Sequence, residues 1–172
     1  MSNIFLSFAR QSREANRAVV TILDKLSNEE REKERGSYYG SLSGLFRHEV
    51  GSFGFFQTIF QEPLTGNAAA GKALAVLAGV KFPKGTLTAD QWKEIATTGA
   101  AVDDAFVDLV SAISEEELQK QIKWFDGTIV PLSFVLQALT LHGAHHRGQI
   151  SQILDELKID NDYSGINSEF LK

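Results

Sequence analysis

"LHGAHHRGQI", residues 141–150, is the stretch that decides what fold and function this chain is expected to have. It contains His142, His145 and His146, three of the four histidines among the 172 residues. Successive residues of an α-helix are turned by about 100°, so His142 and His146 lie only about 40° apart, whereas His145 lies about 60° to the other side of His142. Apolar residues such as Ile150 share the face of His142 and His146, so both imidazoles are expected to point into a helix bundle.

Apolar residues recur at intervals of three and four along most of the chain, as in amphipathic helices. The pattern predicts four long helices, over residues 3–26, 37–61, 88–113 and 131–158. The connection over residues 63–87 is expected to carry one short alanine-rich helix. The sequence therefore predicts an all-α, single-domain four-helix bundle over residues 1–172.

Local signals mark where the helices begin and where they are interrupted. Ser27 with Glu30, and Thr88 with Gln91, have the spacing of capping boxes. The charged run "EEREKER" after Ser27 is expected to be a solvated turn. Asp126-Gly127, between two short β-prone runs in "IKWFDGTIV", predicts a small β-hairpin with a two-residue turn before the last helix.

Composition excludes several classes of protein. Net charge is −5 and no basic stripe is present, which disfavours binding to nucleic acid. The absence of cysteine excludes disulfides, thiolate ligands and a cysteine nucleophile. No signal peptide and no apolar run of membrane-spanning length is seen, so a soluble cytoplasmic protein without membrane contact is expected.

The two histidines on one face suggest a metal site. An i,i+4 pair can direct two ring nitrogens at one ion, and His48, on the apolar face of the second helix, is the only other histidine outside this stretch. Three imidazoles suit zinc or nickel, with iron or copper as alternatives, and they leave a coordination position open. The competing interpretation is that these are hydrogen-bonded core histidines. A metalloprotease HExxH motif is excluded, because Gly143 stands where that motif needs glutamate.

Together with "YYGSLSGLFRHEV" upstream, "HGAHHRGQI" resembles the DinB/YfiT-like family of bacterial metalloproteins. The first helix is similar to the family's pattern at Phe8, Ala15 and Asn16, and the hairpin before the last helix also fits. The resemblance implies a four-helix bundle, often a homodimer, that holds a divalent metal through three histidines. By motif position these are His48, His142 and His146, with His145 a neighbour rather than a ligand.

The chain departs from the family pattern after the histidine of the second helix. Many relatives carry an aspartate a few residues later, where this chain has "EVGSFGFF". Glu49 is the nearest carboxylate, but its position does not match. Either that partner is missing or another residue orients the imidazole. Arg147 also matches the motif and is expected to be structural, because it points about 140° away from His142.

The resemblance also implies a function, since some relatives are thiol-dependent transferases or isomerases. The leading hypothesis is a metal-dependent enzyme that activates a low-molecular-weight thiol, or water, for attack on an electrophilic small molecule. His145 and Glu49 are candidate general bases, and Phe53, Phe56 and Trp124 are candidates to line the substrate site. The alternative is a non-catalytic stress-response or interaction protein with a structural or sensory metal. Binding to DNA is a third hypothesis, which the acidic charge disfavours.

Overall fold

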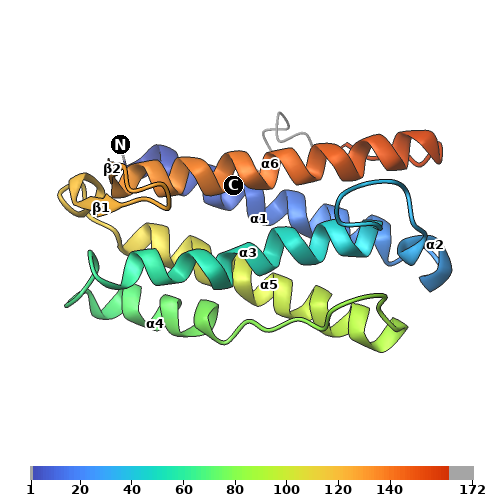
Figure 1. The fold of residues 1–172 in the computed structure, drawn as a ribbon, viewed down its shortest axis with the longest axis horizontal. Coiled ribbons are helices and arrows are strands. Elements are labelled where there is room, and N and C mark those ends of the chain that lie inside the picture. The colour runs from blue at the N-terminus through green and yellow to red at the C-terminus, as the bar shows by residue number, and fades with distance from the viewer. Residues whose placement is uncertain (1, 163–172) are drawn as a thin grey trace.

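Four long helices form the molecule, which is described over residues 2–162 by a computed structural model (Figure 1). They are α1 (Ser2–Leu23), α3 (Leu42–Gln61), α5 (Ala89–Ala112) and α6 (Leu132–Glu156). Three shorter elements are α2 (Asn28–Glu32), α4 (Ala68–Ala78) and a 3₁₀ turn (Glu117–Gln119). The predicted all-α four-helix bundle with a hairpin before the last helix is confirmed, as is the short helix in the long connection.

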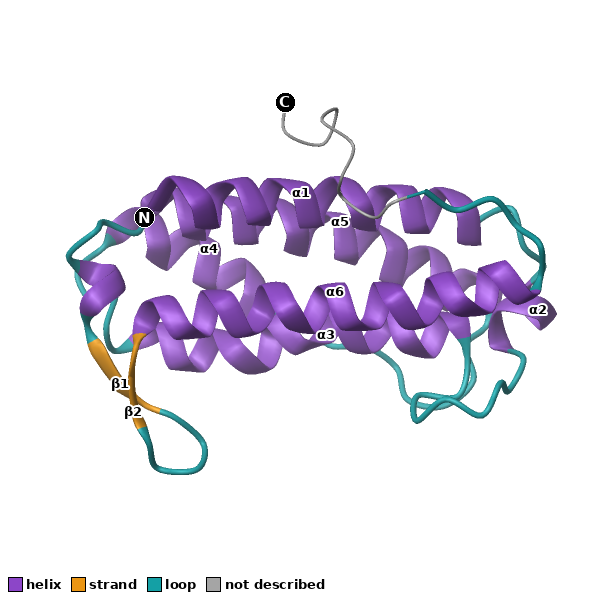
Figure 2. Cartoon of the chain, turned by 90° about the horizontal axis from the view of Figure 1, so that it is seen from above, coloured by secondary structure: helices purple, strands orange, loops and turns teal. Residues whose placement is uncertain are grey.

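The long helices lie in two layers, α3 with α6 and α1 with α5 (Figure 2). The α4 helix packs against α3 and α5. The buried apolar side chains separate into two clusters along the bundle. One cluster contains Phe53, Phe106 and Leu136, and the other contains Val19 and Trp92. Polar side chains from all four long helices lie at the level between these clusters, and the candidate site is built there.

Two predicted helix starts, at Ser27 and Thr88, are confirmed by side chains that cap the backbone. Thr88 and Gln91 form a full capping box at α5, and the Ser27 side chain accepts a hydrogen bond from the backbone N–H of Glu30. The Ser41 side chain accepts from the backbone N–H of Gly44, so α3 begins at Leu42 and not near residue 37. Each cap satisfies an N–H that has no partner within its helix.

The charged run after Ser27 is only partly the solvated turn that was predicted, since Glu29, Lys33 and Glu34 are exposed but Arg31 is not. The run overlaps α2, in which Arg31 is buried and donates to the carbonyl oxygens of Leu23 and Leu26 at 3.1 and 2.5 Å. Arg31 thereby supplies donors to carbonyls at and just beyond the end of α1, where the Leu23 oxygen also accepts from the backbone N–H of Leu26 at 3.1 Å. Charge patterning could not reveal this role, because it depends on the path of the chain after α1.

The hairpin pairs β1 (Gln121–Lys123) with β2 (Ile129–Pro131) in antiparallel register, Lys123 opposite Ile129. The predicted two-residue turn is wrong, because the connection spans residues 124–128. The Asp126 carboxylate accepts from the backbone N–H of Thr128 at 2.9 Å, and Gly127 takes a φ of +88°. These features suit a longer Asp-Gly loop. Within residues 2–162, no helix is both long and apolar enough to cross a bilayer.

Candidate metal centre

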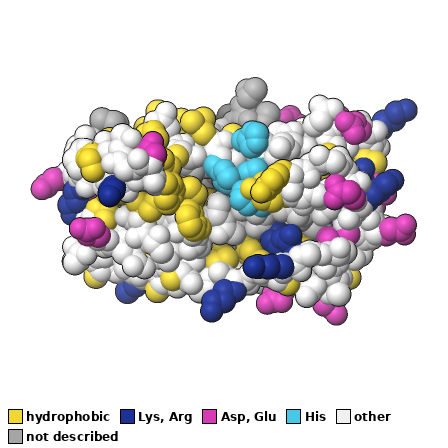
Figure 3. Space-filling model, in the orientation of Figure 1, with side chains coloured by type: hydrophobic (Ala, Val, Ile, Leu, Met, Phe, Trp, Pro, Cys, Tyr) yellow, Lys and Arg dark blue, Asp and Glu magenta, His cyan; other side chains and the backbone are white. Residues whose placement is uncertain are grey.

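Three histidines from two helices meet at the polar level of the bundle. His48 lies on α3, and His142 and His146 lie one turn apart on α6. One potential ligand atom from each ring lies within 4.8 Å of the other two. A zinc ion bonded to three imidazoles at its usual distance needs nitrogens about 3.4 Å apart, so small side-chain rotations would bring the rings into place. Histidine side chains form one group near the middle of the exposed face in Figure 3.

The ring nitrogens are suited to receive an ion. Nε2 of His48 and Nε2 of His142 are buried and have no hydrogen-bond partner within the described residues. Nδ1 of His146 lies 2.7 Å from Oε1 of Gln149. If Nδ1 donates this bond, Nε2 of His146 carries a free lone pair. Unpartnered buried nitrogens are costly in a core and are expected at a metal site, which favours ligands over hydrogen-bonded core histidines.

The environment keeps these imidazoles neutral. Burial, reinforced by the nearby His146 and then His142, lowers the pKa of His48 to about 4. Burial, with His146 and then His145, likewise lowers the pKa of His142 to about 4. Burial also lowers the pKa of His146, although the hydrogen bond with Gln149 opposes that shift. All three rings are therefore in the metal-binding form at neutral pH.

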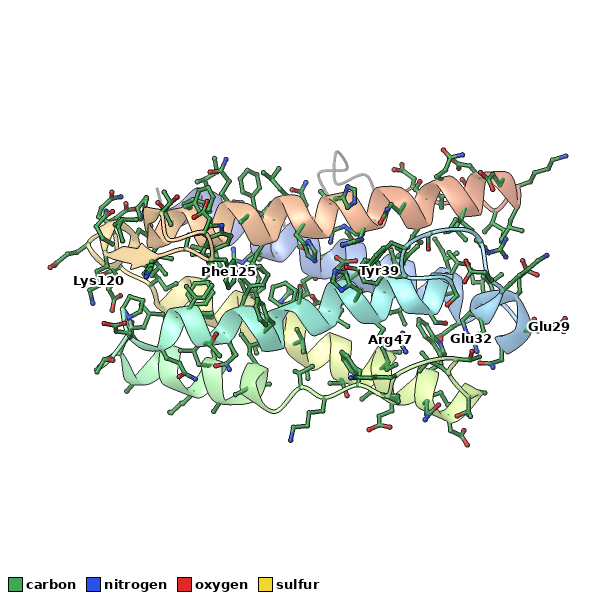
Figure 4. The ribbon with its side chains drawn as sticks, in the orientation of Figure 1. Glu29, Glu32, Tyr39, Arg47, Lys120 and Phe125 are labelled. Atoms are coloured by element: carbon green, nitrogen blue, oxygen red, sulfur yellow. The ribbon has the colours of Figure 1, made fainter. Side chains whose placement is uncertain are left out.

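An aromatic side chain covers His48, the histidine of the cluster that lies on α3. The ring of Tyr39 is stacked on His48, with centroids 3.7 Å apart and planes inclined by 15°. Tyr39, labelled in Figure 4, lies in the turn before α3. Gly44 allows this turn to sit against α3, since a Cβ there would collide with the backbone carbonyl of Tyr39. The sequence showed this tyrosine only as part of a family motif and gave no sign that it would touch His48.

The residues that directly follow His48 and His146 in the sequence, Glu49 and Arg147, form a buried ion pair. Arg147 donates to the Glu49 carboxylate at 2.5 Å and to the Asn16 side-chain oxygen at 3.0 Å. Asn16 donates in turn to Asp103 at 2.9 Å. Burial raises the pKa of Glu49 to about 7 although Arg147 opposes the shift, and burial raises the pKa of Asp103 well above its usual value. Glu49 is thus directed at Arg147, which supports the structural role expected of the arginine.

The other residues proposed from the sequence, the candidate base His145 and the candidate aromatic lining, lie in different surroundings. His145 is exposed and lies outside the group of three histidines that could hold a metal, with its ring centroid 4.9 Å from that of His146. Phe53 does not line a substrate site, because it is buried in the core against Phe106. Phe56 stacks with Trp124, and their ring centroids are 5.9 Å apart. Hydrophobic spacing alone could not distinguish Phe53 from Phe56, since both lie on apolar faces of α3.

A groove of about 650 Å³ opens beside His48 and His142. It is lined by one face of α3, by Tyr39 and by Val80, Phe82, Pro83 and Lys84 from the segment after α4. A separate groove of about 630 Å³ between α1 and α6 includes Arg147 but none of the three clustered histidines. The first groove is therefore the one through which a small molecule can approach the candidate metal position.

Comparisons with known proteins agree with this architecture. A crystal structure of a DinB-like protein from Bacillus cereus matches with a TM-score of 0.54 and 24% sequence identity, over 86% of this chain and 88% of that chain. At that identity the likeness shows the fold alone. A search of curated proteins gives no match. The family model described as DinB family matches residues 1–157, and the chain therefore belongs to the DinB family.

Proposed function

We propose that this protein binds one divalent metal ion through His48, His142 and His146 and uses it to activate a small thiol, or water, for transfer to an electrophilic small molecule. The observation that carries the proposal is the meeting of three neutral imidazoles, two of which have buried Nε2 atoms without a partner. Imidazole ligands without thiolate favour zinc or nickel.

Neighbouring residues would keep the histidine rings in place for the metal. Gln149 fixes the ring of His146, and Tyr39 shields one face of His48 from water. A divalent ion with an open position lowers the pKa of a bound thiol or water, which supplies the nucleophile. The chain has no cysteine, so a reactive thiol has to come from a small molecule that enters the groove.

The first experiment is metal analysis by mass spectrometry on untagged protein. We expect about one ion per chain, lost in His142→Ala and kept in His145→Ala, since His145 lies outside the ligand group. Metal-free protein that cannot be loaded with zinc or nickel would contradict the proposal. Equal loss in both variants would show that the effect is not specific to the proposed ligands.

A second experiment separates an activating site from a structural or sensory one. Cobalt-substituted protein is titrated with a small thiol, and a sulfur-to-cobalt charge-transfer band is expected when the thiol reaches an open position. A spectrum that does not change with the thiol would instead support the alternative, a closed metal site in a non-catalytic protein.

A further inference from the structure

The groove beside the histidines differs in charge from the rest of the molecule. The chain as a whole carries a net charge of −5, yet Arg47 and Lys84 line the groove and none of the lining residues in the described part of the chain is acidic. In Figure 3, Lys and Arg side chains lie next to the histidine group, and hydrophobic side chains gather on its other side. A positive recess on an acidic protein concentrates small anions.

The two cations are held close together by the backbone. Nη1 of Arg47 donates to the carbonyl oxygens of Pro83 and Gly85, at 2.9 and 2.7 Å, so the guanidinium contacts both neighbours of Lys84. Both of these bonds use Nη1, and no bond from Nε or Nη2 to another residue is seen within residues 2–162, so these donors can serve a ligand. Lys84 is exposed. Together they offer several N–H donors to one acidic group.

The other end of the groove is aromatic. Phe55 and Phe56 come from α3, and Phe82 faces Gly51, where a Cβ would lie 3.4 Å from its ring. Phe55 is 61% exposed and stacks on the hairpin residue Phe125, which is 57% exposed. A cluster of solvent-exposed aromatic side chains beside a pocket is typical of a ligand-binding surface. Along α3, Arg47 and Phe55 are about 12 Å apart, with His48 next to the cationic end.

We propose that the groove binds a small organic acid with an aromatic or apolar body. Arg47 and Lys84 hold the acid group, Phe55 and Phe56 hold the body, and the middle of the molecule passes beside His48 and His142. The inference rests on the proposed function in one respect, which is that a metal at the histidines would meet the reactive part of this ligand. Recognition of the acid and of the ring depends on the groove alone.

The test uses 4-phenylbutyrate, 4-phenylbutyl phosphate, the neutral 4-phenylbutanamide and butyrate as probes. Binding is measured by ligand-observed NMR on metal-free and on zinc-loaded protein. On the metal-free protein, where no ion can coordinate an acid, the two phenyl acids are expected to bind about fivefold more tightly than the amide. Comparison of the carboxylate with the phosphate identifies the preferred acid.

Substitutions test separately the cationic end and the aromatic end of the groove. Lys84→Gln is expected to reduce the preference for acid over amide by about twofold to fivefold, and Lys81→Gln, a change of an exposed lysine that does not line the groove, to leave it unchanged. Phe55→Ala is expected to weaken the phenyl acids and not butyrate. Lys81, Lys84 and Phe55 are all exposed, so none of the three changes should impair folding.

Two results would overturn the inference: equal binding of acid and amide, or equal effects of Lys81→Gln and Lys84→Gln. The outcome is independent of the metal proposal. A protein that prefers acids but takes up no metal keeps this inference and loses the proposed function. A protein that binds zinc but shows no preference for acids would contradict this inference and leave the proposed metal site standing.

Discussion

Arg147 donates a 2.5 Å hydrogen bond to the Glu49 carboxylate, and each of these residues directly follows a histidine of the cluster in the sequence. Asn16 and Asp103 extend the pair, so that α1, α3, α5 and α6 are joined at one level. The level lies between the two apolar clusters of the core. The bundle's buried polar network and its candidate metal centre are therefore parts of one arrangement.

Replacing Arg147 by methionine is expected to lower the free energy of unfolding by about 3–5 kcal/mol, because Glu49 would remain buried without its cation. Glu49 has a folded-state pKa of about 7, raised above its ordinary value, so it stabilises the fold at low pH and that contribution is lost as pH rises through about 7. Without Arg147 that pKa rises further. Urea denaturation should therefore show a larger loss at pH 8 than at pH 6.

The control for this change is Arg17→Met, since Arg17 makes ion pairs on the surface with Glu14 and Asp104. Its effect should stay within about 1 kcal/mol. A loss in Arg147→Met that does not depend on pH would mean that Glu49 is not ionised in the native pair.

Two glycines of α6 provide a matched pair for substitution by alanine. A Cβ at Gly143 would lie 2.9 Å from Nη1 of Arg147 and 3.1 Å from Oε1 of Glu49, whereas a Cβ at Gly148 would meet nothing within 4 Å. Gly148→Ala is expected to stabilise the protein by about 0.5–1 kcal/mol through helix propensity. Gly143→Ala is expected to destabilise it by about 1–3 kcal/mol through crowding of the ion pair. Thermal unfolding of the two variants compares these effects, and equal stabilisation by both would show that the pair can move aside.

Metal binding is expected to persist in mildly acidic solution. An ordinary imidazole is mostly protonated at pH 5, but one with a pKa of about 4, as for His48 and His142, is still about nine-tenths neutral there. Proton competition at these two ligands should therefore begin near pH 5, and not near pH 6 as unperturbed imidazoles would suggest. Isothermal titration with zinc between pH 5 and pH 7 measures this. A steep fall in affinity that begins at pH 6.5 would contradict the lowered pKa values.

The stacked tyrosine should control the protonation of His48. In metal-free protein, Tyr39→Ala is expected to raise the pKa of His48 from about 4 towards its ordinary value, because the ring that excludes water from the imidazole is removed. Tyr39→Phe should preserve the low pKa. Tyr38→Ala is the matched control, since Tyr38 is 92% exposed. Histidine resonances followed by NMR through a pH titration report each value, and an unchanged pKa in Tyr39→Ala would assign the shift to the bundle interior alone.

Much of the fold could be predicted from the sequence because its determinants are local. Apolar spacing placed the long helices, and Thr88 with Gln91 marked the start of α5 correctly. The gathering of His48 with His142 and His146 was also predictable, since helical periodicity directs each ring to the bundle interior and few histidines are present.

The remaining features depend on contacts between distant segments. Nothing near Asn16 in the sequence indicates that it pairs with Asp103, and nothing near Arg31 indicates that it binds carbonyls at the end of α1. The stacking of Tyr39 on His48 depends on a backbone turn whose position is set by Gly44. These contacts are defined by helix packing, which residue spacing within one helix does not specify.

The division of the histidines between helices has a consequence for folding. His142 and His146 are neighbours in any state in which α6 has formed, but His48 joins them only when α3 is packed in its native place. An ion held by all three would therefore prefer the folded chain over the unfolded one. By mass action, free metal at 100 times its dissociation constant would add about 2.7 kcal/mol to the stability of the fold. The supply of metal would then affect the stability of the protein as well as its activity.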